Sequence, residues 1–268
     1  MEGRRILQLD QRRADLRFPL PERFAERVAN ARIDRLARQA KFLAAHLSTG
    51  EVLVMHLGMT GRFTIGAPMQ AQETGKFHHQ PGNLSAHDHV VFHMEGGETV
   101  TYNDPRRFGF MELWPAASFE AYPRLKTMGP EPLSNAFSAA YLDTALSGKT
   151  APIKAALLDQ SIIAGLGNIY VCEALYRAGI SPKRLSRTVP GMRASRLAPA
   201  INAVIAEAIA AGGSSISDFA GTDGELGYFQ HRFDVYDREG AACKRCGAAV
   251  KRIVQSGRST FYCSGCQK

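Results

Sequence analysis

The sequence predicts an α+β fold in which a β-rich N-terminal part precedes a helical part and a small metal-binding end. Residues 1–115 contain short apolar segments typical of strands, whereas residues 150–211 carry the periodicity of amphipathic helices. Four of the five cysteines gather between Cys243 and Cys266. With 268 residues, 45% of them apolar, the chain is long enough for two domains of ordinary size.

The N-terminal part is expected to be built mainly from strands. Pro21 opens a short predicted helix over residues 22–28, and Ser48-Thr49-Gly50 forms the predicted turn of a hairpin. Residues 66–86 are rich in Gln, Gly, His and Pro, which predicts a long surface loop. Strands are expected over residues 5–10, 33–47, 52–57, 89–94, 99–102 and 108–114.

The middle of the chain changes to helical periodicity, with glycines at the expected helix ends. Gly179 and Gly212-Gly213 stop two of the predicted helices, and residues 214–227 form a glycine-punctuated loop. Helices are expected over residues 150–158, 168–178 and 193–211. These changes of character predict three domains, over residues 1–115, 116–228 and 229–268.

The charge distribution favours a polyanionic partner. The net charge is +8, and residues 1–41 hold eleven basic against six acidic side chains, while residues 238–268 hold seven against one. Such ends could form a solvated surface, but lysine and arginine also displace counterions from nucleic acid, which is the stronger inference. The chain contains no apolar run of 18 residues and no secretory signal, so we expect a cytoplasmic protein without a membrane partner.

The cysteine spacing predicts a metal centre. Cys243-x2-Cys246 and Cys263-x2-Cys266 can each turn two thiolates toward one ion, and together they complete a tetrahedron of sulfurs. Because the protein fills all four positions, we expect a single structural Zn²⁺ rather than a catalytic one. A redox dithiol is the rival interpretation and would need only one pair. Cys172 stands alone and is expected to be a small buried hydrophobe.

Between the two cysteine pairs, residues 251–262 predict a basic β-hairpin. Ser256-Gly257 occupies its turn and Arg258 lies near the tip. Such a hairpin, held rigid by zinc, suits contact with phosphates, although a solubilising surface hairpin would have the same composition.

Four motifs in order resemble the bacterial formamidopyrimidine-DNA glycosylases. They are "HLGMTGRF" at 56–63, "NDPRRFGF" at 103–110, "LLDQSIIAGLGNIYVCEALYRAGISP" at 157–182 and "QSGRSTFYCSGCQK" at the end of the chain. The resemblance implies an N-terminal β-sandwich, a helix–two-turn–helix domain and a C-terminal zinc finger. It further implies a monomeric, bifunctional glycosylase and abasic-site lyase that flips oxidised purines such as 8-oxoguanine and formamidopyrimidines out of damaged double-stranded DNA.

The resemblance assigns roles to individual positions. Lys41 corresponds to the family's strand lysine, a proton donor in β-elimination, and Arg258 to the finger arginine of δ-elimination. Met59, Arg106 and Phe108 match the side chains that fill the gap left by the flipped nucleotide, whereas taken alone they could be core residues and a surface charge. Residues 214–228, with Gly221, Gly224 and Gly227, match the loop that closes over the base. The implied DNA contacts are Met59, His87, Arg106, Phe108, Lys149, Lys154, Asn168 and Tyr228.

At its N-terminus the chain departs from the family pattern. Relatives begin with Pro-Glu-Leu-Pro-Glu-Val-Glu, whose proline amine attacks C1′ of the damaged nucleotide. Here Met1-Glu2 aligns with the strand that follows that segment, so we assign no nucleophile. Either the start codon is placed too late, which we prefer, or this is a truncated form. Two other functions therefore stay open: a catalytically incomplete protein that binds lesions or abasic sites, and a zinc-ribbon transcription factor.

Overall fold

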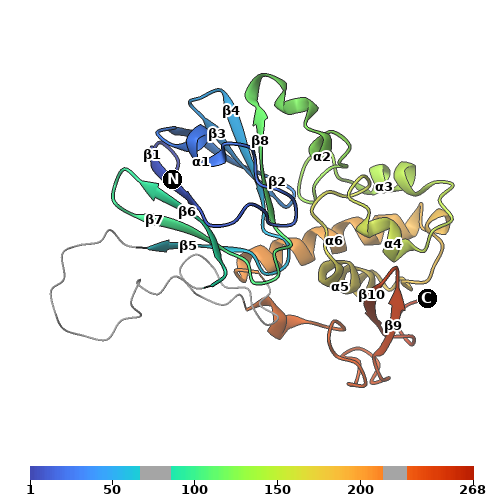
Figure 1. The fold of residues 1–268 in the computed structure, drawn as a ribbon. Coiled ribbons are helices and arrows are strands. Elements are labelled where there is room, and N and C mark those ends of the chain that lie inside the picture. The colour runs from blue at the N-terminus through green and yellow to red at the C-terminus, as the bar shows by residue number, and fades with distance from the viewer. Residues whose placement is uncertain (67–85, 214–227) are drawn as a thin grey trace, which may run out of the picture. The chain divides into compact units, whose positions relative to one another are not determined.

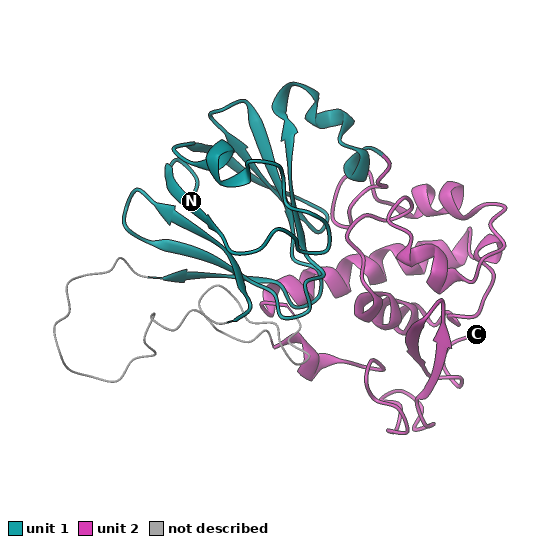
Figure 2. Ribbon diagram, viewed as in Figure 1, with its two compact units in different colours: residues 1–126, 215–227 teal, residues 127–214, 228–268 magenta. Residues whose placement is uncertain are grey.

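The computed structural model describes residues 1–66, 86–213 and 228–268, and the chain divides after Lys126 into two units (Figure 1, Figure 2). Unit 1 comprises Met1–Lys126, and unit 2 comprises residues 127–213 together with residues 228–268. The predicted loops over 67–85 and 214–227, including Gly221, Gly224 and Gly227, lie outside the described residues. No helix in the described ranges combines the length and the apolar character needed to cross a membrane.

Unit 1 is a β-sandwich of two antiparallel four-stranded sheets, in the orders β1-β6-β7-β5 and β2-β3-β4-β8. Apolar side chains from both sheets share one core, where Phe92 of one sheet and Leu53 and Met111 of the other are almost fully buried. The predicted sandwich is therefore confirmed. Its strands are β1 Ile6–Gln11, β2 Ile33–Gln39, β3 Phe42–Leu47, β4 Glu51–His56, β5 Arg62–Gly66, β6 Asp88–Met94, β7 Thr99–Asn103 and β8 Phe110–Pro115.

Two strand predictions in unit 1 were wrong in detail. Residues 33–47 form not one strand but the hairpin β2–β3, whose turn is Ala40-Lys41 with Ala40 at φ +52°. Strand β8 begins at Phe110, so Phe108 lies in the loop before it rather than in the strand. Strand β5 was not predicted. The short helix predicted over 22–28 is present as α1, Phe24–Val28, and unit 1 ends with η1 Ala116–Ala121 and α2 Pro123–Lys126.

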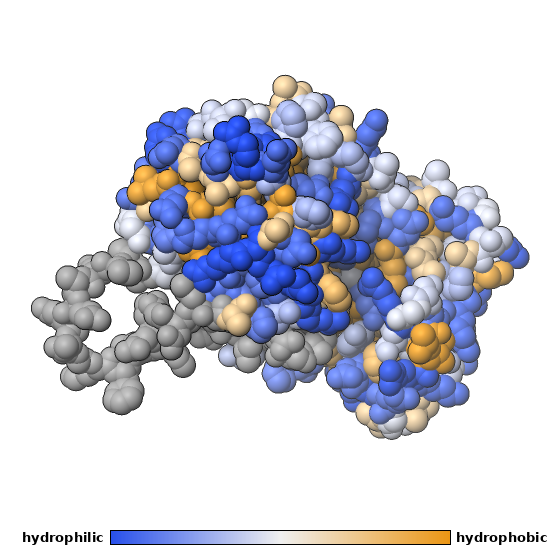
Figure 3. All heavy atoms as spheres, viewed as in Figure 1, coloured by the Kyte–Doolittle hydropathy of each residue, from blue (hydrophilic) through white to orange (hydrophobic). Residues whose placement is uncertain are grey.

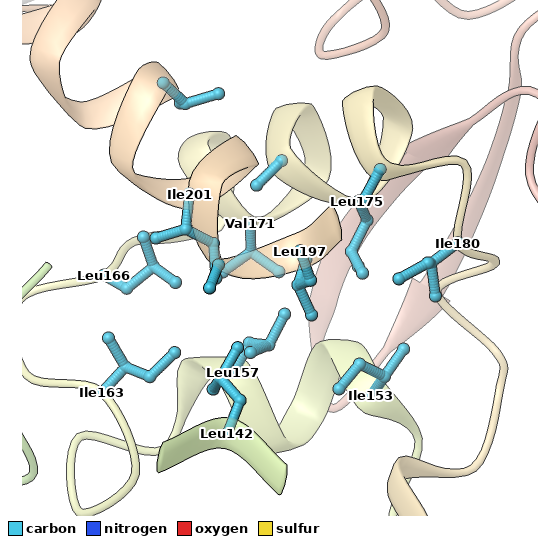
Figure 4. Packing of buried hydrophobic residues seen from close by; sticks show 14 of the residues in the cluster. Leu142, Ile153, Leu157, Ile163, Leu166, Val171, Leu175, Ile180, Leu197 and Ile201 are labelled. Atoms are coloured by element: carbon cyan, nitrogen blue, oxygen red, sulfur yellow. The ribbon is translucent and has the colours of Figure 1, made fainter. Parts of the chain in front are cut away.

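Unit 2 is built on helices that pack around one apolar core (Figure 4). Leu157, Val171 and Leu197, from three different helices, are completely buried in it. Helix α5 has the predicted bounds and ends at Gly179, whose φ of +70° makes the left-handed cap that glycine favours. The helices are α3 Ala139–Leu146, α4 Ile153–Leu158, α5 Asn168–Ala178, η2 Ser186–Thr188, α6 Met192–Ala210 and η3 Phe229–Arg232.

A two-stranded hairpin completes unit 2 and packs on helix α5 through a small core of its own. Strand β9, Lys251–Gln255, pairs with β10, Arg258–Tyr262, around the predicted turn Ser256-Gly257. Both turn residues have positive φ, 50° and 71°, which is the geometry of the tightest hairpin turns and explains the glycine. The lone Cys172 is buried in this core, as expected.

Candidate nucleic-acid interface and metal centre

Three of the predicted DNA-contacting side chains lie on two loops of unit 1. Met59 sits in the turn between β4 and β5 with 66% of its surface exposed, and Phe108 lies in the loop before β8 with 41% exposed. The Arg106 guanidinium lies over the Phe108 ring, 4.6 Å from its centre. Because both side chains are exposed, the alternative that Met59 and Phe108 are core residues is ruled out.

A buried carboxylate joins these two loops. Asp104 is completely buried, and it accepts hydrogen bonds from the Thr60 hydroxyl at 2.5 Å, the Gly109 N–H at 2.9 Å and the Tyr102 hydroxyl at 3.1 Å. Burial, and then the Asp104 charge, raise the pKa of Tyr102, so this phenol stays a donor. A buried carboxylate needs such donors to offset its lost hydration. Asp104 therefore fixes the Met59 turn to the loop that carries Arg106 and Phe108.

The two loops also meet backbone to backbone. Gly58 has φ +69°, and a Cβ at this position would lie 2.5 Å from the Gly109 nitrogen. The Thr60 hydroxyl additionally accepts from the Arg106 N–H at 3.3 Å. Only glycine allows this approach, since any side chain would push the loops apart.

Lys41 and His56 lie beside the Met59 turn. Lys41 is exposed at the β2–β3 turn, not within a strand, and its neighbour Phe42 pairs with His56 of β4. The His56 ring stacks on Phe110, with centroids 5.3 Å apart, and its Nδ1 accepts the Gly58 N–H at 3.0 Å. Burial, and then the charge of Lys41, lower the pKa of His56, which keeps the ring neutral and able to accept this bond.

His87, which is exposed, belongs to the same part of unit 1. It lies just before β6, and its carbonyl accepts the Asp104 N–H at 3.0 Å. The structure thus brings together five of the predicted site residues in unit 1: Lys41, Met59, His87, Arg106 and Phe108.

In unit 2, Lys154 and Asn168 converge on the zinc-finger hairpin. The Lys154 Nζ donates to the Ser259 carbonyl at 3.1 Å and to the Thr260 hydroxyl at 2.7 Å, and the Asn168 amide donates to the same carbonyl at 3.0 Å. Lys154 is completely buried, whereas its implied role is a contact with the DNA backbone at the protein surface. Burial, and to a smaller extent the charge of Arg258, lower its pKa.

The remaining predicted contacts of unit 2 are on its surface. Arg258 is exposed at the first position of β10, next to the hairpin turn. Lys149 is exposed after helix α3, and Tyr228 is 61% exposed at the start of η3. Helix α5 begins at Asn168 with no side chain capping its first N–H groups, which leaves them available to an anion. Hydrophilic side chains predominate on the face of both units drawn in Figure 3.

Four cysteines form a metal centre at the base of the hairpin. Their sulfur atoms all lie within 4.8 Å of one another, with Cys243 and Cys266 3.8 Å apart and Cys246 and Cys263 3.5 Å apart. These separations fit sulfurs bound about 2.3 Å from one tetrahedral zinc ion. Although burial opposes ionisation, hydrogen bonds from the Tyr176 hydroxyl and the Arg245 N–H lower the pKa of Cys243 to about 6. The centre holds one structural zinc ion.

Sequence reasoning missed the residues that support the site. Asp104, Thr60, His56 and Thr260 bond to the predicted residues or to their close neighbours in the chain, but no periodicity or spacing marks them. All four lie inside three of the motifs, so position within a motif is the signal that could have found them.

Comparison with known proteins covers the whole chain. Residues 1–111 match the model of the formamidopyrimidine-DNA glycosylase N-terminal domain, residues 128–220 its H2TH domain, and residues 240–268 the zinc finger found in FPG and IleRS. The chain is 54% identical to a formamidopyrimidine-DNA glycosylase of Chelativorans and 53% identical to one of Ruegeria pomeroyi, in each case over 100% of this chain and 94% of the relative.

Solved structures give the same result. The MutM (Fpg) protein of Thermus thermophilus is 38% identical, with a TM-score of 0.84 over 100% of this chain and 92% of the other. The Lactococcus lactis Fpg in complex with DNA containing an abasic site is 29% identical, with a TM-score of 0.84 over 100% and 94%.

Proposed function

Since the chain belongs to the formamidopyrimidine-DNA glycosylase family, we propose that it excises oxidised purines from double-stranded DNA and then cleaves the abasic site as a lyase. It is a DNA glycosylase of base-excision repair. The proposed substrates are 8-oxoguanine and formamidopyrimidines. We further propose that it acts as a monomer on the bacterial nucleoid, in the cytoplasm.

One observation carries the proposal: exposed Met59 and Phe108, with Arg106 stacked on Phe108, stand on two loops that Asp104 locks together. An enzyme that acts on a base must remove it from the stack, which costs about a few kcal/mol per step. Apolar side chains that enter the gap offset this cost, but only if they are already rigid when they meet DNA. The three hydrogen bonds to Asp104 supply that rigidity.

The other predicted residues receive roles consistent with their positions. Lys41, an exposed ammonium beside the Met59 turn, is the proposed proton donor of β-elimination. Arg258 is proposed to act in δ-elimination and to contact a phosphate. The proposed division of labour follows the predicted boundaries: residues 1–115 fill the gap, residues 116–228 bind the backbone and residues 229–268 present Arg258. The other proposed DNA contacts are His87 in the first of these segments and Lys149, Asn168 and Tyr228 in the second, with Lys154 beside Ser259 and Thr260.

The relatives weigh against the non-catalytic alternative. Proteins named as glycosylases match this chain over its entire length at more than half identity, which a protein kept only for binding would have less reason to retain. The transcription-factor alternative is disfavoured by the two exposed apolar side chains, because they suit unstacking rather than the reading of a base sequence.

To test the proposal, the full chain is incubated with a duplex that contains a single 8-oxoguanine and, as the control, with the same duplex containing guanine. We expect base release, strand cleavage and a borohydride-trapped covalent adduct with the damaged duplex alone. Tight binding of the lesion without release or adduct would establish the non-catalytic alternative. Equal affinity for both duplexes, varying instead with the flanking sequence, would establish the transcription-factor alternative.

A further inference from the structure

Lys154 presents an unusual arrangement, a charged side chain with no exposed surface. Within the described part of the chain, no carboxylate lies at ion-pairing distance from its ammonium. Its recorded partners are neutral oxygens, the Ser259 carbonyl and the Thr260 hydroxyl. Burying an unpaired ammonium is costly, so its presence here calls for a compensating role.

Both partners of Lys154 directly follow Arg258 in strand β10. The Ser259 carbonyl also accepts a hydrogen bond from the Asn168 amide at 3.0 Å. Three hydrogen bonds, from helix α4 and from the first residue of α5, therefore hold the two residues after Arg258. On its N-terminal side, Arg258 directly follows the two-residue hairpin turn. Besides the pairing of β10 with β9, Lys154 and Asn168 therefore fix the backbone that aims the Arg258 guanidinium.

We infer that Lys154 is a positioning residue, which sets Arg258 through Ser259 and Thr260 and does not itself contact DNA. The inference rests on the proposed function, in which Arg258 meets the DNA at the abasic site. It replaces the direct phosphate contact implied for Lys154 by resemblance. A buried ammonium suits this role because it can donate in several directions to the backbone and side chain of one strand, which a neutral side chain of that length cannot do.

The two possibilities differ in their response to salt. A lysine that binds a phosphate releases condensed counterions, so its loss reduces the slope of log K against log[salt] by about 0.9. A positioning lysine leaves the slope unchanged. Moreover, Thr260 is itself completely buried, so replacing its hydroxyl can affect DNA only through Lys154 and the strand.

The experiment compares Thr260→Val, Lys154→Met and the double variant, with Thr260→Ser as the conservative replacement and Thr144→Val on the surface of α3 as the control. Zinc content and melting temperature establish that each variant folds. We then measure amide hydrogen exchange of residues 258–262 in the absence of DNA. We also measure the affinity for an abasic-site duplex at several salt concentrations.

We expect faster exchange over residues 258–262 and affinity about tenfold weaker in Thr260→Val and Lys154→Met, with unchanged salt slopes. The double variant is expected to be no worse than Lys154→Met, and Thr260→Ser should behave as the parent. A lower slope in Lys154→Met, with Thr260→Val like the parent in both measurements, would overturn the inference. Failure of the parent chain to bind the duplex would instead count against the proposed function, and the exchange data would still decide whether Lys154 holds the strand.

Discussion

The two proposed DNA-contacting regions are held by opposite kinds of buried charge. In unit 1, the carboxylate of Asp104 gathers hydroxyl and amide donors and thereby presents Met59, Arg106 and Phe108. In unit 2, the ammonium of Lys154 donates to Ser259 and Thr260 beside Arg258, and a metal centre holds the far end of the hairpin.

The difference follows from what each region must present. Two loops that expose apolar side chains have no core of their own, and a carboxylate can bind several N–H and O–H groups from both loops at once. A two-stranded hairpin is only marginally stable in water by itself, so its ends must be fixed, one by zinc and one by a lysine. Four perturbations should separate the two regions.

Loss of zinc is expected to have the largest effect and to spare unit 1. Zinc contributes about 10–16 kcal/mol to the folding of isolated fingers, so a chelator or Cys246→Ser should unfold residues 240–268 and abolish binding of lesion DNA. Exchange protection of β6 and β7 should persist. Cys172→Ala, which removes a buried cysteine outside the metal centre, should still bind one zinc ion per chain. Full DNA affinity after complete removal of zinc would contradict this account.

Asp104→Asn should do the reverse and disturb unit 1 alone. The amide keeps one acceptor oxygen but replaces the other by an NH2 group and removes the negative charge, so the donors on that side lose their acceptor. We expect this to destabilise unit 1 by about 3 kcal/mol. Chemical denaturation monitored at Trp114 measures this, and Asp34→Asn on the surface of β2 is the control. Unchanged stability and unchanged DNA affinity in Asp104→Asn would show that the loops do not depend on this carboxylate.

Met59→Ala tests the loops without unfolding them. Because Met59 is exposed, stability should change by less than about 0.5 kcal/mol, whereas excision of 8-oxoguanine should slow by about tenfold or more. Met192→Ala in unit 2 removes an even more exposed methionine and should excise at the parental rate. Equal rates for the two variants would remove Met59 from the mechanism.

The pH dependence of unit 1 should be the smallest effect. Because the pKa of His56 is lowered in the folded protein, the unfolded state takes up a proton first as the pH falls. The contribution of neutral His56 to the free energy of unfolding is therefore fully present above about pH 6.5. It is lost as the pH falls below this value, by at most about 1.4 kcal/mol per pH unit. Melting curves between pH 7.5 and 5.5 should show a smaller loss in His56→Phe than in the parent; an equal loss would assign the effect to other groups.

Much of the fold could be predicted because local chemistry determines it. The cysteine spacing predicted the metal centre, and Ser256-Gly257 and Gly179 predicted a turn and a helix end that need positive φ. The Ala40-Lys41 turn could not be predicted, because neither residue favours the left-handed region and residues 33–47 are continuous in character. Helix α3 was missed although Ser138 caps it, its hydroxyl accepting the Tyr141 N–H at 3.1 Å.

The supports of the site were the least predictable part. Lysine is among the residues least often buried, so nothing in the sequence places Lys154 inside the protein. Its environment depends on Ser259 and Thr260, more than a hundred residues further along the chain. Asp104 likewise acquires its role only when tertiary structure brings Thr60 to it. The motif at 103–110 contains Asp104 and the resemblance names Lys154, but neither shows that these charges are buried or which segments they hold.

Fluorescence of 2-aminopurine placed next to an abasic-site analogue tests the central claim most directly, because it reports unstacking without requiring catalysis. The full chain should raise the fluorescence on binding, while Met59→Ala and Asp104→Asn, at saturating protein, should raise it much less than Met192→Ala. Full-strength fluorescence with Met59→Ala and Asp104→Asn, or none with the parent protein bound, would contradict the account.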